Sequence, residues 1–101
     1  MATSRRYTAP ASWLAASGQW PGGPFKPGCP RYALKTAQVV ERLEATMLED
    51  GRSARQVALA AEIDPGTLSR LRSGQAVPDL ATLDALERVL GADLWGGRAK
   101  V

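Results

Sequence analysis

Arginine is the residue type in this sequence with the greatest capacity to bind another molecule. Its guanidinium group keeps its charge and presents a planar fork of N–H donors that fits phosphate and carboxylate groups. Six arginines lie between residues 41 and 95 together with all ten acidic residues, so this stretch has a net charge of −4. Evidence for a nucleic-acid partner therefore has to come from the positions of the arginines and not from the net charge. The six are Arg42, Arg52, Arg55, Arg70, Arg72 and Arg88.

Residues suited to catalysis or metal binding are scarce. The chain has no histidine, which excludes imidazole as a general base or metal ligand. Its single cysteine, Cys29, excludes an intrachain disulfide or a thiolate zinc site. The carboxylates of the first helical segment have no partner base or ligand set, so we predict that they form a solvated face. We therefore expect no enzyme activity, no cofactor and no bound metal.

The two ends of the chain are basic. Residues 1–40 carry five basic and no acidic residues, and residues 96–101 form a short basic tail. Arg5 and Arg6 resemble the start of a twin-arginine export signal, but polar residues and proline interrupt the apolar stretch of about 7–15 residues that should follow. The longest apolar run, residues 57–61, is far shorter than the roughly 20 residues that span a bilayer. We expect a cytoplasmic protein with no membrane partner.

Residues 1–35 are predicted to form an irregular basic arm. They hold five of the seven prolines and five of the six aromatic residues. The proline and glycine density of residues 20–30 argues against a helix or a central strand, whereas residues 10–16 could form a short helical turn. We favour packing of the aromatic rings on the globular domain or on a second subunit. The alternative is that Arg5 and Arg6 reach the minor groove of DNA, as homeodomain arms do.

From Thr36 to residue 95 the apolar residues recur with the helical period of about 3.6 residues. The first predicted helix buries Val40, Leu43 and Met47 and stops at Gly51. Strand-type alternation is absent. The predicted fold class is therefore all-α, a compact bundle of four to five short helices that includes a helix-turn-helix and follows the irregular arm.

The later helices have clear start signals. Ser53 and Gln56 form an S-x-x-Q capping box for a helix over residues 54–61. Asp64 and Pro65 open a helix over residues 64–73, as N-cap and first helical residue. Asp79 caps a fourth helix that carries a leucine stripe to residue 90. Residues 93–95 are expected to add one further turn.

The second and third predicted helices, joined by a tight turn at Glu62 and Ile63, have helix-turn-helix geometry. Residues 37–95 resemble the lambda-repressor-like, Cro/C1-type (XRE) helix-turn-helix domain. The resemblance depends on residues 53–83, which read SARQVALAAEIDPGTLSRLRSGQAVPDLATL. Its most specific feature is the spacing from Ser53 through Gly74 to Pro78.

The resemblance implies sequence-specific binding of double-stranded DNA, usually by a homodimer on a two-fold operator, with the helix 64–73 in the major groove. Carried onto this chain, the base-facing positions are Pro65, Gly66, Thr67 and Arg70. The phosphate-facing positions are Ala54, Ser69, Arg72, Ser73 and Gln75. Arg52 and Arg55 would add phosphate contacts, and Arg70 could bind a guanine through two hydrogen bonds.

This sequence departs from the family pattern at several of these positions. Ala54 stands where the family often has glutamine, and Arg72 where it often has glutamate. Pro65 and Gly66 replace polar readers of base edges, so DNA shape has to supply part of any specificity. Glu62 stands where the family often has glycine. If that residue needs a positive φ, its side chain costs roughly 1 kcal/mol.

Two functions follow as hypotheses. The first is a bacterial or phage transcriptional regulator, associated with the nucleoid, in which residues 36–95 bind DNA as a homodimer. The alternative is a protein–protein interaction module or antitoxin on a helix-turn-helix scaffold, with the arm 1–35 binding a partner protein. The net negative charge of residues 41–95 and the absence of polar side chains at Pro65 and Gly66 favour the alternative. The arginines near the starts of the second and third helices favour the regulator. The end at Trp95 and the arm are the expected self-contacts.

Overall fold

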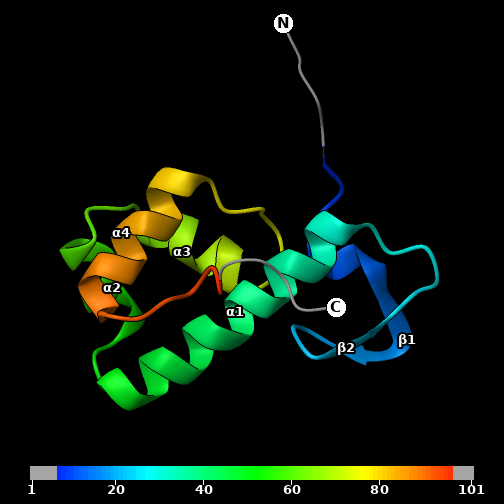
Figure 1. Cartoon of the computed structure of the whole chain (residues 1–101), viewed down its shortest axis with the longest axis horizontal. Helices are drawn as coiled ribbons and strands as arrows, with labels where there is room; N and C mark the ends of the chain where they lie inside the picture. Colours follow the sequence, from blue (N-terminus) through cyan, green and yellow to red (C-terminus); the bar gives the residue numbers. More distant parts are fainter. Residues whose placement is uncertain (1–6, 97–101) are drawn as a thin grey trace, which may run out of the picture.

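The computed structural model describes residues 7–96, which form four α-helices preceded by a small N-terminal unit (Figure 1). This N-terminal unit consists of a 3-10 helix (Pro10–Trp13) and the strands β1 (Leu14–Gln19) and β2 (Gly23–Phe25). The helices are α1 (Arg31–Asp50), α2 (Ala54–Ala60), α3 (Pro65–Arg72) and α4 (Leu80–Leu90). The longest helix, α1, has the hairpin beside its N-terminal end and the other three helices gathered along its C-terminal half.

The start signals of α2, α3 and α4 are confirmed in atomic detail. The backbone N–H of Ser53 donates to Gln56 Oε1 at 2.8 Å, and the N–H of Gln56 donates to Ser53 Oγ at 3.1 Å, which completes the capping box. Asp64 accepts from the N–H of Thr67 at 3.3 Å, with Pro65 as the first helical residue. Asp79 caps α4 in the same way, and its hydrogen bonds with Thr82 lower the pKa of its carboxyl.

The core lies between α1 and the three later helices. The predicted inner face of α1 is buried at Val40, Leu43 and Met47. Leu68 and Leu71 of α3 belong to the same apolar cluster, which also contains these further residues: Val39, Val57, Ala58, Ala61, Leu83, Ala85, Leu86 and Leu94. Within residues 7–96 no helix combines the length and apolarity that crossing a bilayer requires.

The chain is mostly helical, as predicted, but the arm predicted to be irregular contains a small sheet. Strands β1 and β2 pair as an antiparallel hairpin, with Leu14 opposite Phe25 and Gln19 opposite Gly23. Part of this hairpin lies in residues 20–30, where proline and glycine argued against a central strand. Both strands of a two-stranded hairpin are edge strands, and an edge strand tolerates Pro24 because one side of it needs no ladder partner. The expected helical turn in residues 10–16 is present as the shorter 3-10 helix.

Two helix limits also differ from expectation. α1 begins at Arg31, five residues before Thr36; Ala33 and Thr36 are buried, and the helix packs on the 3-10 helix. The extra turn expected at residues 93–95 is absent from this described part of the chain. Glu87 Oε2 instead accepts the backbone N–H groups of Leu94 and Trp95 at 2.8 and 3.0 Å, which satisfies donors that a helical turn would have paired.

The N-terminal unit packs on the loop that follows α3. The N–H of Ala11 donates to the carbonyl of Gly74 at 2.9 Å, and Trp20 packs against the apolar cluster. A Cβ at Gly74 would lie 2.7 Å from both the Trp20 ring and the Ala11 methyl group, and φ there is +80°. Only glycine fits this close approach. Trp20 of the arm therefore packs on the domain, as favoured from the sequence, while Arg5 and Arg6, the subject of the alternative, lie outside the described residues.

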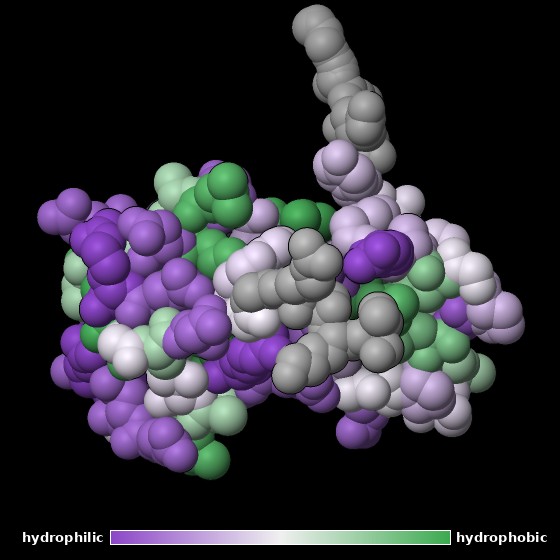
Figure 2. All heavy atoms as spheres, in the orientation of Figure 1, coloured by the Kyte–Doolittle hydropathy of each residue, from purple (hydrophilic) through white to green (hydrophobic). Residues whose placement is uncertain are grey.

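Polarity is distributed unevenly over the surface. Figure 2 shows strongly hydrophilic side chains gathered over the helical end and paler or apolar ones over the hairpin end. This matches the sequence, since all ten acidic residues follow residue 40.

The turn between α2 and α3 holds a strained residue. Glu62 has φ +60°, and within residues 7–96 it is the one residue other than glycine with a positive φ. The backbone there is fixed by hydrogen bonds from the N–H groups of Glu62 and Ile63 to the carbonyls of Leu59 and Ala58, at 3.1 and 3.0 Å. The positive φ considered from the sequence is thus confirmed.

Replacement of this residue by glycine should stabilise the fold. We expect Glu62→Gly to raise the free energy of unfolding by about 1 kcal/mol, because glycine adopts this φ without a Cβ clash. Urea unfolding followed by circular dichroism measures the change. In the control Glu41→Gly, on the exposed side of α1, glycine should lower the same quantity by about 1 kcal/mol. Equal destabilisation by both substitutions would show that Glu62 is not strained.

Candidate nucleic-acid interface

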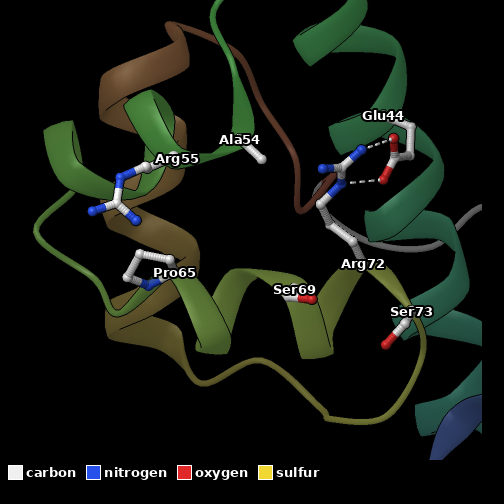
Figure 3. Close-up of a pocket in the computed structure, with 7 residues that line it drawn as sticks. All are labelled: Glu44, Ala54, Arg55, Pro65, Ser69, Arg72 and Ser73. Carbon is white, nitrogen blue, oxygen red and sulfur yellow. Dashed lines mark hydrogen bonds and ion pairs between the residues drawn. The ribbon is translucent and has the colours of Figure 1, made fainter.

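An open groove of about 410 Å³ lies where α1, α2 and α3 meet (Figure 3). Six of its seven lining residues belong to the predicted DNA-binding set. They come from α2, from α3 and from the residue that follows α3. They are Ala54, Arg55, Pro65, Ser69, Arg72 and Ser73. Folding therefore brings together residues up to 19 positions apart in sequence, and the groove they form contains cationic and hydroxyl donors. The seventh lining residue is Glu44, which the sequence analysis missed.

Arg70 lies in the last turn of α3, and its side chain reaches back toward the first turn. Its Nη2 lies 3.4 Å from Thr67 Oγ1, and its side chain is exposed. A Cβ at Gly66 would lie 3.1 Å from Arg70 Nη1 and 2.7 Å from Asp64 Oδ2. The absence of a side chain at Gly66 thus leaves room for the guanidinium group to lie along the first turn of the helix. Of the predicted base-facing residues, Gly66, Thr67 and Arg70 form one cluster there, with Pro65 beside them at the edge of the groove.

Arg72 is held by an ion pair with Glu44 of α1. Arg72 Nε and Nη2 donate to the two carboxylate oxygens of Glu44 at 2.6 and 2.8 Å. The hydrogen bonds to Glu44 raise the pKa of Arg72 above its usual value. The prediction that the carboxylates of the first helix form a solvated face is therefore wrong for Glu44. The Arg72 side chain is half-buried, at 34% exposed.

Arg52 also has a partner within the protein. Its Nε and Nη2 donate to the Asp50 carboxylate at 2.8 and 3.0 Å, and Nη2 also donates to the carbonyl of Val89 at 3.0 Å. These contacts join the ends of α1 and α4, and the hydrogen bond from Arg52 lowers the pKa of Asp50. Arg52 lines a second hollow of about 210 Å³ next to the groove, which Ala54 and Arg72 line as well.

The remaining predicted residues lie around the end of α3. Ser73 Oγ donates to the carbonyl of Arg70 at 3.2 Å, and the backbone N–H of Gln75 donates to the same carbonyl at 2.9 Å. Gln75 is exposed and lies beyond the groove lining. Arg55 is exposed at the start of α2 and lines the groove.

A weak sequence signal for Glu44 existed. Glu44 follows the buried Leu43, and Arg72 follows the buried Leu71, so both side chains lie at the boundary between the core and the surface. An arginine where the family often has glutamate suggests an acid on the facing helix. The pairing itself spans 28 residues and could not be read from local spacing.

Comparison with known proteins supports the interpretation of this region. A sequence model of the Cro/C1-type helix-turn-helix family matches residues 43–94, just over half of the 101-residue chain. The match includes every residue that lines the groove and none of the N-terminal unit. No curated protein and no solved structure matched the chain.

The contact at Gly66 generates a stability prediction. In an unobstructed helix, Gly→Ala should stabilise by about 1 kcal/mol. We expect Gly66→Ala to give little or no gain in the free energy of unfolding, because the new methyl group displaces the Asp64 carboxylate from a cap that is worth about 1 kcal/mol. Urea unfolding measures the change.

A matched control lies on the same helix. Ser69→Ala at an exposed position of α3 should stabilise by a few tenths of a kcal/mol through helix propensity alone. In the Gly66→Ala background, a further Asp64→Ala substitution should cost much less than it costs in the wild type. A full gain of about 1 kcal/mol from Gly66→Ala would contradict the crowding.

Proposed function

The chain belongs to the Cro/C1-type helix-turn-helix family, and we propose that it is a sequence-specific DNA-binding transcriptional regulator of bacterial or phage type. The observation that carries the proposal is the groove itself, which gathers predicted phosphate-binding residues from α2 and α3 beside the exposed face of α3. In this proposal α3 is the recognition helix and enters the major groove of the duplex. The protein acts by binding, in the cytoplasm at the nucleoid, and not as an enzyme.

Base recognition is assigned to the face of α3 that carries Thr67 and Arg70. Arg70 can extend from its place over Gly66 and donate two hydrogen bonds to guanine O6 and N7, a contact worth about 1–3 kcal/mol of discrimination. Thr67 offers a methyl group to thymine or a hydroxyl to a base edge. Pro65 and Gly66 contribute shape and close approach, so part of the specificity comes from the deformability of the DNA.

Phosphate contacts position the protein on the duplex. Arg55, Arg72, Ser69 and Ser73 line the groove as donors, with Ala54 at the start of α2, and Gln75 adds a side chain beyond α3. Arg52 and Arg72 are each paired with an acid, so their contribution to the salt dependence is small. If Arg55 and Arg70 release counterions, affinity should fall with salt with a log–log slope of about −1.8.

Homodimer formation is proposed through the apolar surface around Trp95. Leu80 and Trp95 are 78% and 44% exposed and line two adjoining hollows of about 250 and 290 Å³. Val77 and Pro78 also line the hollow of about 250 Å³. Exposed apolar groups gathered beside hollows are typical of protein–protein contacts. A two-fold dimer presents two recognition helices to half-sites about one turn of DNA apart.

A second candidate is an interaction module or antitoxin in which the arm binds a partner protein. It is favoured by the net charge of −4 over residues 41–95 and by the absence of polar side chains at Pro65 and Gly66. Docking of the N-terminal unit on Gly74 places that unit beside the end of α3, where a partner on the arm would also cover DNA-binding residues.

DNA titration separates the two candidates. Random duplex DNA should bind the wild type in a salt-sensitive way, and selection from a random pool should yield a two-fold motif. Arg70→Ala should weaken binding of the selected site roughly 5- to 150-fold and relax one position of the motif. Arg72→Ala should weaken all sequences about equally. The control Arg88→Ala, in an exposed pair with Asp84 on α4, should bind like the wild type. A wild type indifferent to DNA and salt supports the interaction module.

Dimerisation is tested separately by light scattering. The wild type should be a dimer at tens of micromolar, and Leu80→Glu should make it monomeric because a charge would be buried in the apolar contact. Leu48→Glu is the matched control, since Leu48 is 85% exposed on α1 and does not line the Trp95 surface. A monomeric wild type would remove the two-fold operator from the proposal.

A further inference from the structure

We infer that Glu44 is a positioning residue, which holds Arg72 so that its remaining guanidinium nitrogen, Nη1, faces a DNA backbone phosphate in the groove. The inference rests on the proposed function. In this inference an acidic residue of α1 strengthens the binding of DNA, although its negative charge alone would weaken it.

The geometry of the pair is the first argument. Glu44 binds Arg72 through Nε and Nη2, at 2.6 and 2.8 Å, and this bidentate contact fixes the plane of the guanidinium group. Figure 3 shows the third nitrogen pointing away from Glu44, across the groove toward Ala54. Arginine has more donors than one carboxylate can accept, so the pair leaves donors of Nη1 directed to the open side.

The rigidity of the support is the second argument. Glu44 lies one residue after Leu43, which is fully buried, and three before Met47, which is buried too. Arg72 follows the buried Leu71 in the same way. Both partners therefore project from helices that the core fixes, and a preorganised donor loses little freedom when its ligand binds.

The surroundings of Nη1 are the third argument. Ser69 and Ser73 line the same groove as Arg72, and the exposed Ser69 hydroxyl is a further donor there, whereas Ser73 Oγ donates to the carbonyl of Arg70. Charge-assisted N–H donors next to hydroxyl donors are the chemistry that binds a phosphate oxygen. Without Glu44, the long Arg72 side chain would move among many rotamers and meet the phosphate in few of them.

A double-mutant cycle in DNA affinity tests the inference on the full chain. Dissociation constants for one duplex are measured at one salt concentration for the wild type, Glu44→Gln, Arg72→Ala and the double variant. We expect Glu44→Gln to weaken binding about fivefold or more, although it removes a negative charge. In the Arg72→Ala background, Glu44→Gln should cause no weakening, because the residue it positions is gone. The control Glu41→Gln, on the exposed side of α1, should bind as tightly as the wild type or slightly more tightly.

The outcomes are distinguishable. Circular dichroism confirms that each variant is folded at the assay temperature, and Glu44→Asp, which keeps the charge but shortens the reach, serves if Glu44→Gln unfolds. Binding by Glu44→Gln that equals or exceeds the wild type overturns the inference, as does equal weakening in both Arg72 backgrounds. A wild type that binds no duplex overturns the proposed function instead, whereas a wild type that binds while Arg72→Ala has no effect overturns only the role of the pair.

Discussion

Burial of Leu68 and Leu71 is the constraint from which the functional surface follows. The two leucines lie on one side of α3 and are almost completely enclosed by the core. A helix whose inner side is fixed in this way has its outer side fixed as well, and here that side carries Ser69 and Arg70. The same packing brings the end of α3 against α1, where Arg72 meets Glu44. One apolar contact thus sets both the exposed face and the wall of the groove.

The electrostatics of the molecule combine a mildly acidic domain with arginines in defined positions. Asp50 holds Arg52 and Glu44 holds Arg72, so acids of α1 determine where these two guanidinium groups point. Arg55 and Arg70 extend from exposed positions on α2 and α3. The net negative charge of residues 41–95 is therefore compatible with a local cluster of arginine donors, because Asp50 and Glu44 orient the arginines with which they pair as well as neutralising their charge.

Sequence alone predicted the parts of the fold that depend on neighbours within one helical turn. Ser53 and Gln56 complete their capping box, and Asp64 caps α3, because these contacts need no distant partner. The hairpin was missed because its turn and second strand are rich in proline and glycine, and the early start of α1 because this part of the helix packs on the 3-10 helix of the N-terminal unit. The groove residues were predicted through family resemblance, whereas Glu44 required knowing that α1 and α3 meet at Arg72.

The close approach at Gly74 extends the folding unit beyond the helix-turn-helix segment. The segment matched by the family begins at residue 43, within α1, and leaves out both the first half of that helix and everything before it. In the intact chain Trp20 and Ala11 cover Gly74 and help to close the apolar interior. A fragment trimmed to the matched segment would expose that interior to water at the end of α3. The segment that folds as a unit is therefore longer than the segment that the family match identifies.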